Sequence, residues 1–316
     1  MAPAPRWSRT ERRPAGFRMI PPARLSLVAA LLVILARPSL AQEFAPRIEP
    51  SWPESLFRFF DLGPEPGEGG DPESIEEENL DFIETDRNSL TGAPLVTGRG
   101  VGIMELAYSY LNFPNEGVKH SFPESLFRFG ITRRIELRVG WNYETGGPEE
   151  FEEGNIAARF GVNAESQIYY GTKIQLTAQE GLRPRSALLL QGHTPTGGPT
   201  TATQIRAGLI SGWELPNDWT FDWAVRFAPD GEDGDGYEMW IPSAVIKFPF
   251  AENRFFTHLE FFGLYSANKE QNISSNFLDT GLHYLITPDL EIGTIIGMQL
   301  QENPGYFVNV GLGFRF

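Results

Sequence analysis

Residues 135–144 read IELRVGWNYE, and this stretch decides the fold. Apolar side chains occupy every second position, and polar or small residues, including Glu136 and Arg138, stand between them. Because successive side chains of a β-strand point to opposite faces, this alternation is typical of a strand with one apolar and one polar face. Three further segments alternate in the same way: 219–228, 290–300 and 306–316. The sequence therefore predicts an all-β protein.

A soluble β-sandwich also alternates, so strand length and charge placement must distinguish the two folds. The segments run about 10 to 13 residues, the length that a tilted strand needs to cross a bilayer, whereas globular strands average about 5 or 6. Full charges on the polar faces would be costly against a dry sandwich core but are solvated in a wet lumen. We therefore predict a transmembrane up-and-down antiparallel β-barrel whose aromatic side faces lipid.

The spacing of the turns gives the number of strands. Walking backwards from a periplasmic C-terminus, short turns alternate with longer loops, among them 112–120 and 229–236, as outer-membrane barrels require. The strand-like segment 156–162 is assigned to an excursion outside the membrane, because counting it would give an odd total. About twelve strands remain, near 101–111, 122–131, 134–144, 167–177, 184–193, 202–214, 218–228, 237–248, 254–266, 276–286, 290–300 and 306–316.

The N-terminus resembles an export signal. Arg24 precedes the apolar run 25–36, which is shorter than the roughly 18 to 20 residues of a spanning helix, and Ser39-Leu40-Ala41 fits a cleavage site. We predict a cleaved signal peptide over 1–41, with Met19 as an alternative start. The chain is then expected to reach the outer membrane of a Gram-negative-type bacterium.

An acidic leader rich in Pro and Gly follows at 42–98, and the barrel is expected over 99–316. We expect the leader to be mostly flexible, because such a composition buries too little apolar surface to offset its ordering entropy. The nonapeptide SWPESLFRF at 51–59 recurs at 121–129 with one aromatic exchange. A tolerated duplication is the favoured explanation; the alternative is that the first copy plugs or pairs with the barrel.

Composition excludes several kinds of chemistry. The chain has no Cys, four His and a formal net charge of -15, which rules out thiolate sites and argues against nucleic acid as a partner. No nucleophile elbow, phosphate loop or paired-His zinc motif is present, so we expect no enzyme, no metal and no cofactor. The acidic stretch 230–236 lacks EF-hand spacing, and a solvated hairpin loop is favoured over a calcium site.

The candidate functional residues are charged and titratable side chains on the inward strand faces, where they would form a lumen network of both signs. They are Glu136, Arg138, Lys173, Arg206, Asp222, Arg226, Lys247, His258, Glu260, Asp279, His283, Glu291 and Arg315. Within this network His258 with Glu260, and Asp279 with His283, could form a proton-sensitive cluster. The competing interpretation is that these groups only fix strand register as lumen pairs.

Short motifs in a constant order resemble one outer-membrane family. They are ETDR at 84–87, PESLFRFGI at 123–131, IELR at 135–138, TPTG at 194–197, DTGLHY at 279–284 and GLGFRF at 311–316. Over about 84–316 the chain resembles the proteins catalogued as "putative meta-pathway of phenol degradation". The resemblance implies an outer-membrane barrel that is often labelled a transporter, with a link to aromatic catabolism.

Twelve strands lie between the eight of a barrel filled by its own side chains and the 16 or more of an open channel. Since many inward positions are glycine, we expect a passive, narrow pore or binding channel for small organic solutes, with aromatic ones as one candidate class. A closed structural or adhesion barrel is the alternative. A lipid hydrolase using Ser243 or Ser266 with His258 is less favoured, because no motif supports it.

The expected partners are outer-membrane lipid, small organic solutes and the barrel-assembly machinery. The machinery would recognise the C-terminal strand, which ends on the aromatic residues Phe314 and Phe316.

Overall fold

The computed structural model describes residues 82–114, 117–146, 166–197, 202–232, 235–267 and 274–316. The predicted signal peptide, the first copy of the nonapeptide and the excursion at 156–162 lie outside these residues.

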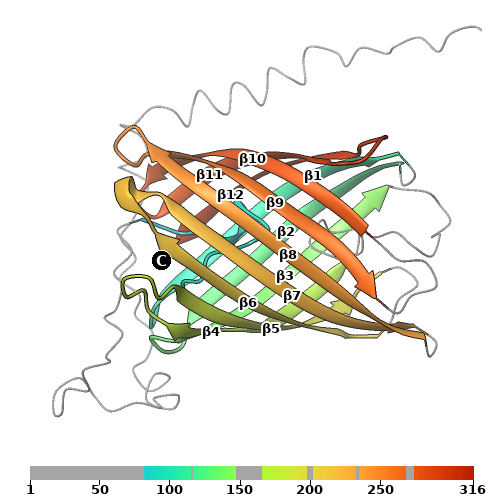
Figure 1. Ribbon diagram of the computed structural model, residues 1–316, viewed down its shortest axis with the longest axis horizontal. Coiled ribbons are helices and arrows are strands. Elements are labelled where there is room, and N and C mark those ends of the chain that lie inside the picture. Colours follow the sequence, from blue (N-terminus) through green and yellow to red (C-terminus); the bar gives the residue numbers. More distant parts are fainter. Residues whose placement is uncertain (1–81, 115–116, 147–165, 198–201, 233–234, 268–273) are drawn as a thin grey trace, which may run out of the picture. The chain divides into compact units, whose positions relative to one another are not determined.

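The described residues form a closed barrel of twelve antiparallel strands (Figure 1). The strands are β1 Gly102–Phe113, β2 Gly117–Gly130, β3 Ile135–Gly146, β4 Gln167–Thr177, β5 Arg185–Pro195, β6 Gln204–Glu214, β7 Thr220–Glu232, β8 Asp235–Phe250, β9 Phe255–Ala267, β10 Ser274–Thr287, β11 Leu290–Gln299 and β12 Tyr306–Arg315. Each strand pairs with its neighbours in sequence, and β1 pairs with β12 to close the ring. The predicted fold class and strand count are confirmed.

Two loops expected to be long are tight connections. Strands β1 and β2 pair as far as Phe113 and Gly117, so the loop expected at 112–120 is mostly strand. The pairing shifts register between Ser121 and Glu124, which accommodates Pro123, a residue that cannot donate to a regular ladder. Likewise β7 and β8 pair as far as Glu232 and Asp235, so the acidic stretch continues both strands.

The outward face of the barrel is apolar. On β3 the outward Leu137, Val139 and Tyr143 are 41%, 48% and 50% exposed, while the inward Glu136 and Arg138 are buried. Other outward side chains continue the apolar surface: Leu259, Phe261, Leu278, Leu282, Ile296, Met298, Val310 and Leu312. So large an apolar surface is unfavourable in water and matches the hydrocarbon of a bilayer.

Among the described residues, no helix has the length and hydropathy needed to cross a membrane.

The last part of the expected leader lies inside the barrel. We call residues 82–100 the plug (cyan in Figure 1). Ile83 N–H donates to the Pro288 carbonyl in the β10–β11 turn, and Gly100 N–H donates to the Gly130 carbonyl at the end of β2. Both ends of the plug therefore lie at the short-turn end of the barrel, so the chain enters and leaves the lumen on the same side.

The plug, which includes the last residues of the predicted leader, is held by the barrel wall; the rest of that leader lies outside the described residues. Thr85, Asn88, Thr91 and Ala93 are at most 2% exposed. The only regular structure in the plug is one 3-10 turn, Asp86–Asn88. Composition gives no sign of this, because it counts apolar surface within the leader alone, whereas the wall supplies the partners of these polar residues.

Candidate functional site

Asp86 of the plug is the centre of a buried cluster of charges. Its carboxylate lies 2.8 Å from Lys173 Nζ and 3.6 Å from Arg128 Nη1, and it also accepts a hydrogen bond from Arg138 Nη1. Two wall carboxylates complete the cluster: Glu136 accepts from Arg128 Nε and Nη2, both at 3.0 Å, and Glu105 lies 3.2 Å from Arg128 Nη1. Three acids thus balance three bases only while Asp86 is in place.

Wall carboxylates also hold the donors of the plug at several points. Glu105 accepts hydrogen bonds from the N–H groups of Asp86 at 3.1 Å and Arg87 at 2.9 Å. Glu260 accepts from the N–H groups of Leu90 at 2.7 Å and Thr91 at 2.6 Å. Glu136 accepts from Thr97 N–H at 3.0 Å, and Glu291 accepts from Asn88 Nδ2 at 3.1 Å. Hydrogen bonds to charged acceptors are stronger than neutral ones. The plug is therefore fixed by polar contacts from several sides of the wall.

Lysine and arginine side chains of the wall donate hydrogen bonds to backbone carbonyls of the plug. Lys173 Nζ donates to the carbonyls of Ala93 at 3.0 Å and Leu95 at 3.1 Å, and Arg226 donates to the Leu90 carbonyl. Lys247 lies 3.1 Å from Glu84 and 3.5 Å from Asp222. The wall thus satisfies backbone donors of the plug with carboxylates and backbone acceptors with cations, which lets a polar segment stay in the lumen.

Most of the predicted lumen residues gather at this level of the barrel. The buried ones are Glu136, Arg138, Lys173, Asp222, Lys247, His258, Glu260, Asp279, His283 and Glu291. Arg206 and Arg226 are half-buried and line a cavity beside the plug. Arg315 stands apart at the short-turn rim, where its Nη2 lies 2.6 Å from the exposed Asp289. Sequence reasoning missed Asp86, Glu105 and Arg128.

The aromatic C-terminus closes the barrel seam. Gly102 N–H donates to the Phe316 carbonyl at 2.9 Å, and the rings of Phe314 and Phe316 lie 5.6 Å apart. Their recognition by the assembly machinery stays a prediction.

The Asp86 cluster makes a prediction about pH. Burial by itself raises the pKa of the Asp86 carboxyl, but Arg128, Lys173 and Arg138 outweigh it and hold the pKa well below its ordinary value of 3.8. The stability that Asp86 contributes is therefore fully present above about pH 4 and is lost only as the pH falls through the lowered pKa. We expect 13C NMR of aspartate-labelled protein to show this carboxyl still ionised at about pH 4. A titration midpoint at or above 3.8 would contradict the cluster.

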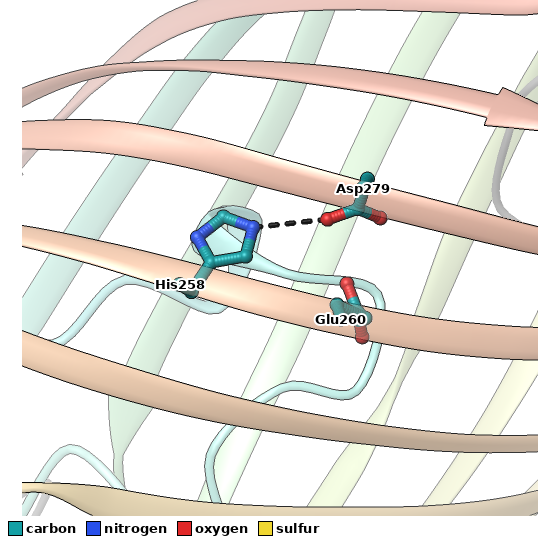
Figure 2. A group of neighbouring side chains, drawn as sticks. All are labelled: His258, Glu260 and Asp279. Atoms are coloured by element: carbon teal, nitrogen blue, oxygen red, sulfur yellow. Dashed lines mark hydrogen bonds and ion pairs between the residues drawn. The ribbon is translucent and has the colours of Figure 1, made fainter.

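A row of titratable groups crosses β9, β10 and β11 beneath the plug. His258 Nε2 lies 3.0 Å from Asp279 Oδ1, and Asp279 is the cross-strand partner of Glu260 (Figure 2). His283 Nδ1 lies 3.2 Å from Glu291 Oε1. The two imidazole rings are 5.4 Å apart. The structure thus pairs His258 with Asp279 and His283 with Glu291, and the two ends of the row bind the plug.

The loop half of the lumen is apolar on one side. Phe262 stacks on Phe277 with ring centres 4.7 Å apart, and Phe307 lies 6.4 Å from Phe262. Further buried members of this cluster are Leu111, Phe113, Ala228, Met239, Ile241, Leu264 and Ile295. Sequence reasoning missed this surface because it assigned apolar side chains to the lipid. The sequence did contain the inward direction of Phe262, because side chains two positions apart share a face of a strand and Glu260 faces inward.

A cavity of about 250 Å³ lies between the plug and this surface. Phe262 and Phe307 line it on the apolar side, and Arg206, Tyr169 and His193 contribute polar groups. It is close in size to the smaller pockets that hold small molecules. The arrangement can therefore accept a small organic molecule with an apolar body and a polar end.

The inward glycines do not form an open bore. A Cβ at Gly140 would lie 2.0 Å from the Tyr169 ring, and one at Gly293 would lie 2.2 Å from His283. The space that these glycines leave is filled by neighbouring side chains. The narrow lumen expected from these positions is occupied by the plug and by large side chains of the wall.

Neither candidate serine can act with His258. Along the β8–β9 ladder Ser243 is opposite Phe262, and Ser266 is opposite Met239. Phe262 is four positions from His258 on β9, which is about 13 Å at the usual rise per residue, and Ser266 is eight positions away, which is about 26 Å. The geometry gives no support to the lipid hydrolase.

Comparison with solved structures supports the fold. The barrel resembles the NanC porin with a TM-score of 0.51 and 9% identity over 67% of this chain and 98% of the porin. It also aligns with an outer membrane channel from Pseudomonas putida F1, with a TM-score of 0.49 and 10% identity over 74% of this chain and 100% of the channel. At such low identity the likeness to the porin concerns the fold alone. No curated protein matches the sequence.

The family is identified from the sequence itself. A family model described as "Putative MetA-pathway of phenol degradation" matches residues 85–316, which include the plug from Thr85 onward and all twelve strands. The protein is thus an outer-membrane-type β-barrel that belongs to the family described as "Putative MetA-pathway of phenol degradation".

Proposed function

We propose that this protein is an outer-membrane channel that lets small organic solutes pass passively, and that the plug sets whether the lumen is open. The observation that carries the proposal is the cavity of about 250 Å³ between the plug and an apolar lumen surface. A solute entering from the loop side would meet the apolar rings before the plug. The proposal includes export through the signal peptide at 1–41 and membrane insertion through the C-terminal strand.

The plug supports gating because polar contacts hold it. Apolar contacts also contribute, since Ile83 and Leu90 pack against the apolar clusters and Ala93, Leu95 and Val96 are buried, but the charged contacts are the ones that a change in protonation or a bound ion can alter. A buried ion pair contributes little net stability to a protein, yet removing one of its partners is strongly destabilising because the other charge stays buried without compensation. A segment held in this way can be released by a local change in charge while the strand ladder of the barrel stays intact.

A closed structural barrel is the second candidate, since the plug crosses the described lumen at the level of the charged cluster. A channel lets ions and solutes cross the membrane through its lumen, whereas a closed barrel does not. We expect purified mature protein in planar bilayers to give small, intermittent conductance steps, and liposomes containing it to take up benzoate faster than empty liposomes. A disaccharide of larger size serves as the control solute. Absence of both conductance and benzoate uptake, in the wild type and in a plug-released variant, would favour the closed barrel.

A further inference from the structure

We propose that His258, Glu260 and Asp279 form a binding site for a divalent transition-metal cation of the zinc class. The β9 residues His258 and Glu260 point inward two positions apart, and Asp279 of β10 is the cross-strand partner of Glu260 (Figure 2). One nitrogen and two carboxylate oxygens lie within 4.8 Å of one another. His258 Nε2 and Asp279 Oδ1 are 3.0 Å apart, close to the separation of two ligands that each lie about 2.0 to 2.2 Å from one zinc ion.

The charge of the cluster favours a cation. Glu260 and Asp279 are 0% and 4% exposed, and within the described part of the chain neither has a lysine or arginine at ion-pair distance. Two neighbouring carboxylates removed from water repel each other when both are ionised. Glu260 accepts hydrogen bonds from the plug and Asp279 is paired with His258, but neither contact places a full positive charge between the two carboxylates. A shared proton or a divalent cation would relieve the repulsion, and the histidine beside the pair favours the cation.

A second histidine faces the same group. His283 Nε2 and His258 Nδ1 are buried and have no hydrogen-bond partner among the described residues. A Cβ at Gly281 would lie 2.6 Å from His258 Cε1 and 2.8 Å from His283 Nε2, so the bare glycine lets the two rings meet over one space. His283 Nε2 is therefore an unpartnered polar atom, on a fully buried side chain, that faces the His258 ring of the cluster across Gly281.

The donor set indicates the class of metal. One or two imidazoles with carboxylates suit zinc and its first-row neighbours, whereas calcium takes six to eight oxygen ligands. Asp279 also lines the cavity beside the plug, which gives a cation a route to the otherwise buried site. The expectation from the sequence that the chain holds no metal depended on the lack of a local motif, and this site is assembled from two strands.

Metal binding would act on the plug through Glu260. Its oxygens accept from Leu90 N–H at 2.7 Å and from Thr91 N–H at 2.6 Å. A cation coordinated by this carboxylate competes with those donors for the same oxygens. We therefore expect bound metal to loosen the middle of the plug. The metal site itself does not depend on the channel proposal.

The test uses the full mature protein, refolded in detergent, with zinc chloride as the probe. Calorimetry is expected to give one zinc per chain, and zinc X-ray absorption is expected to show imidazole and oxygen ligands. His258→Gln and Asp279→Asn should each weaken binding at least about tenfold, since even outer-shell changes cost 10- to 100-fold. His193→Gln is the matched control, because His193 is a buried histidine of β5 that lines the same cavity.

The proposal is overturned if the wild type binds no zinc at micromolar concentrations, or if His258→Gln and His193→Gln bind it equally well. Electrophoresis of unheated samples shows whether each variant is folded. Should a variant fail to fold, the absorption spectrum of the zinc-loaded wild type decides: imidazole in the first shell supports the site, and an all-oxygen shell refutes it. Channel recordings are not needed for either outcome.

Discussion

Replacing Asp86 with alanine is expected to release the plug and turn intermittent conductance into a sustained open level. The substitution leaves Lys173, Arg128 and Arg138 buried around a missing anion, with Glu105 and Glu136 as their remaining partners. Breaking a buried ion pair in this way costs about 3–5 kcal/mol. Much of that cost falls on the docked state, because the wall cations regain water once the plug leaves. The open population should rise about a hundredfold or more.

Single-channel recording in planar bilayers measures this change directly, and protease sensitivity of the plug reports its release independently. Asp218→Ala is the matched control: this exposed aspartate lies in the β6–β7 turn and accepts a hydrogen bond from Asn253 Nδ2 at 3.1 Å. It should leave both the conductance and the protease pattern unchanged. An Asp86→Ala barrel that folds, resists protease at 82–100 and stays closed would show that the ion cluster does not hold the plug.

The barrel could be predicted from the sequence because its signal is local. Each strand shows its own alternation of apolar and polar residues, and turn residues mark where it ends. The strand expected at 167–177, for example, is found as Gln167–Thr177. The errors lie at strand ends such as the start of β2, which was expected at 122 and is found at Gly117. There the pairing with β1 and β3, through a shift in register, decides the boundary.

The inward charges were predictable for the same reason, but their partners were not. Parity alone places Arg138 and Lys173 on the inward face. It gives no information on Asp86, which is 87 residues from Lys173 in the chain and lies in a segment of leader-like composition. The plug is stabilised by long-range contacts with the finished barrel, so no window of sequence around Asp86 contains its partners.

Two neighbouring phenylalanines on β9 test which strand face lines the lumen and which face contacts lipid. Phe262 and Phe261 are adjacent residues of one type on β9, 1% and 42% exposed respectively. Phe262→Ala is expected to lower the free energy of unfolding by about 3–5 kcal/mol, because it removes the stacking on Phe277 and leaves a cavity. Phe261→Ala removes only an outward contact with lipid, which is worth about 1.5–3 kcal/mol.

Urea unfolding in lipid vesicles, followed by tryptophan fluorescence, compares the two variants. Flux separates them further, because Phe262 lines the cavity beside the plug whereas Phe261 does not. Phe262→Ala should therefore admit bulkier aromatic solutes into liposomes, and Phe261→Ala should match the wild type. If Phe261→Ala changed solute selectivity and Phe262→Ala did not, the apolar rings of β9 could not form the entry surface, and solutes would have to enter along the polar wall that includes Tyr169 and Arg206.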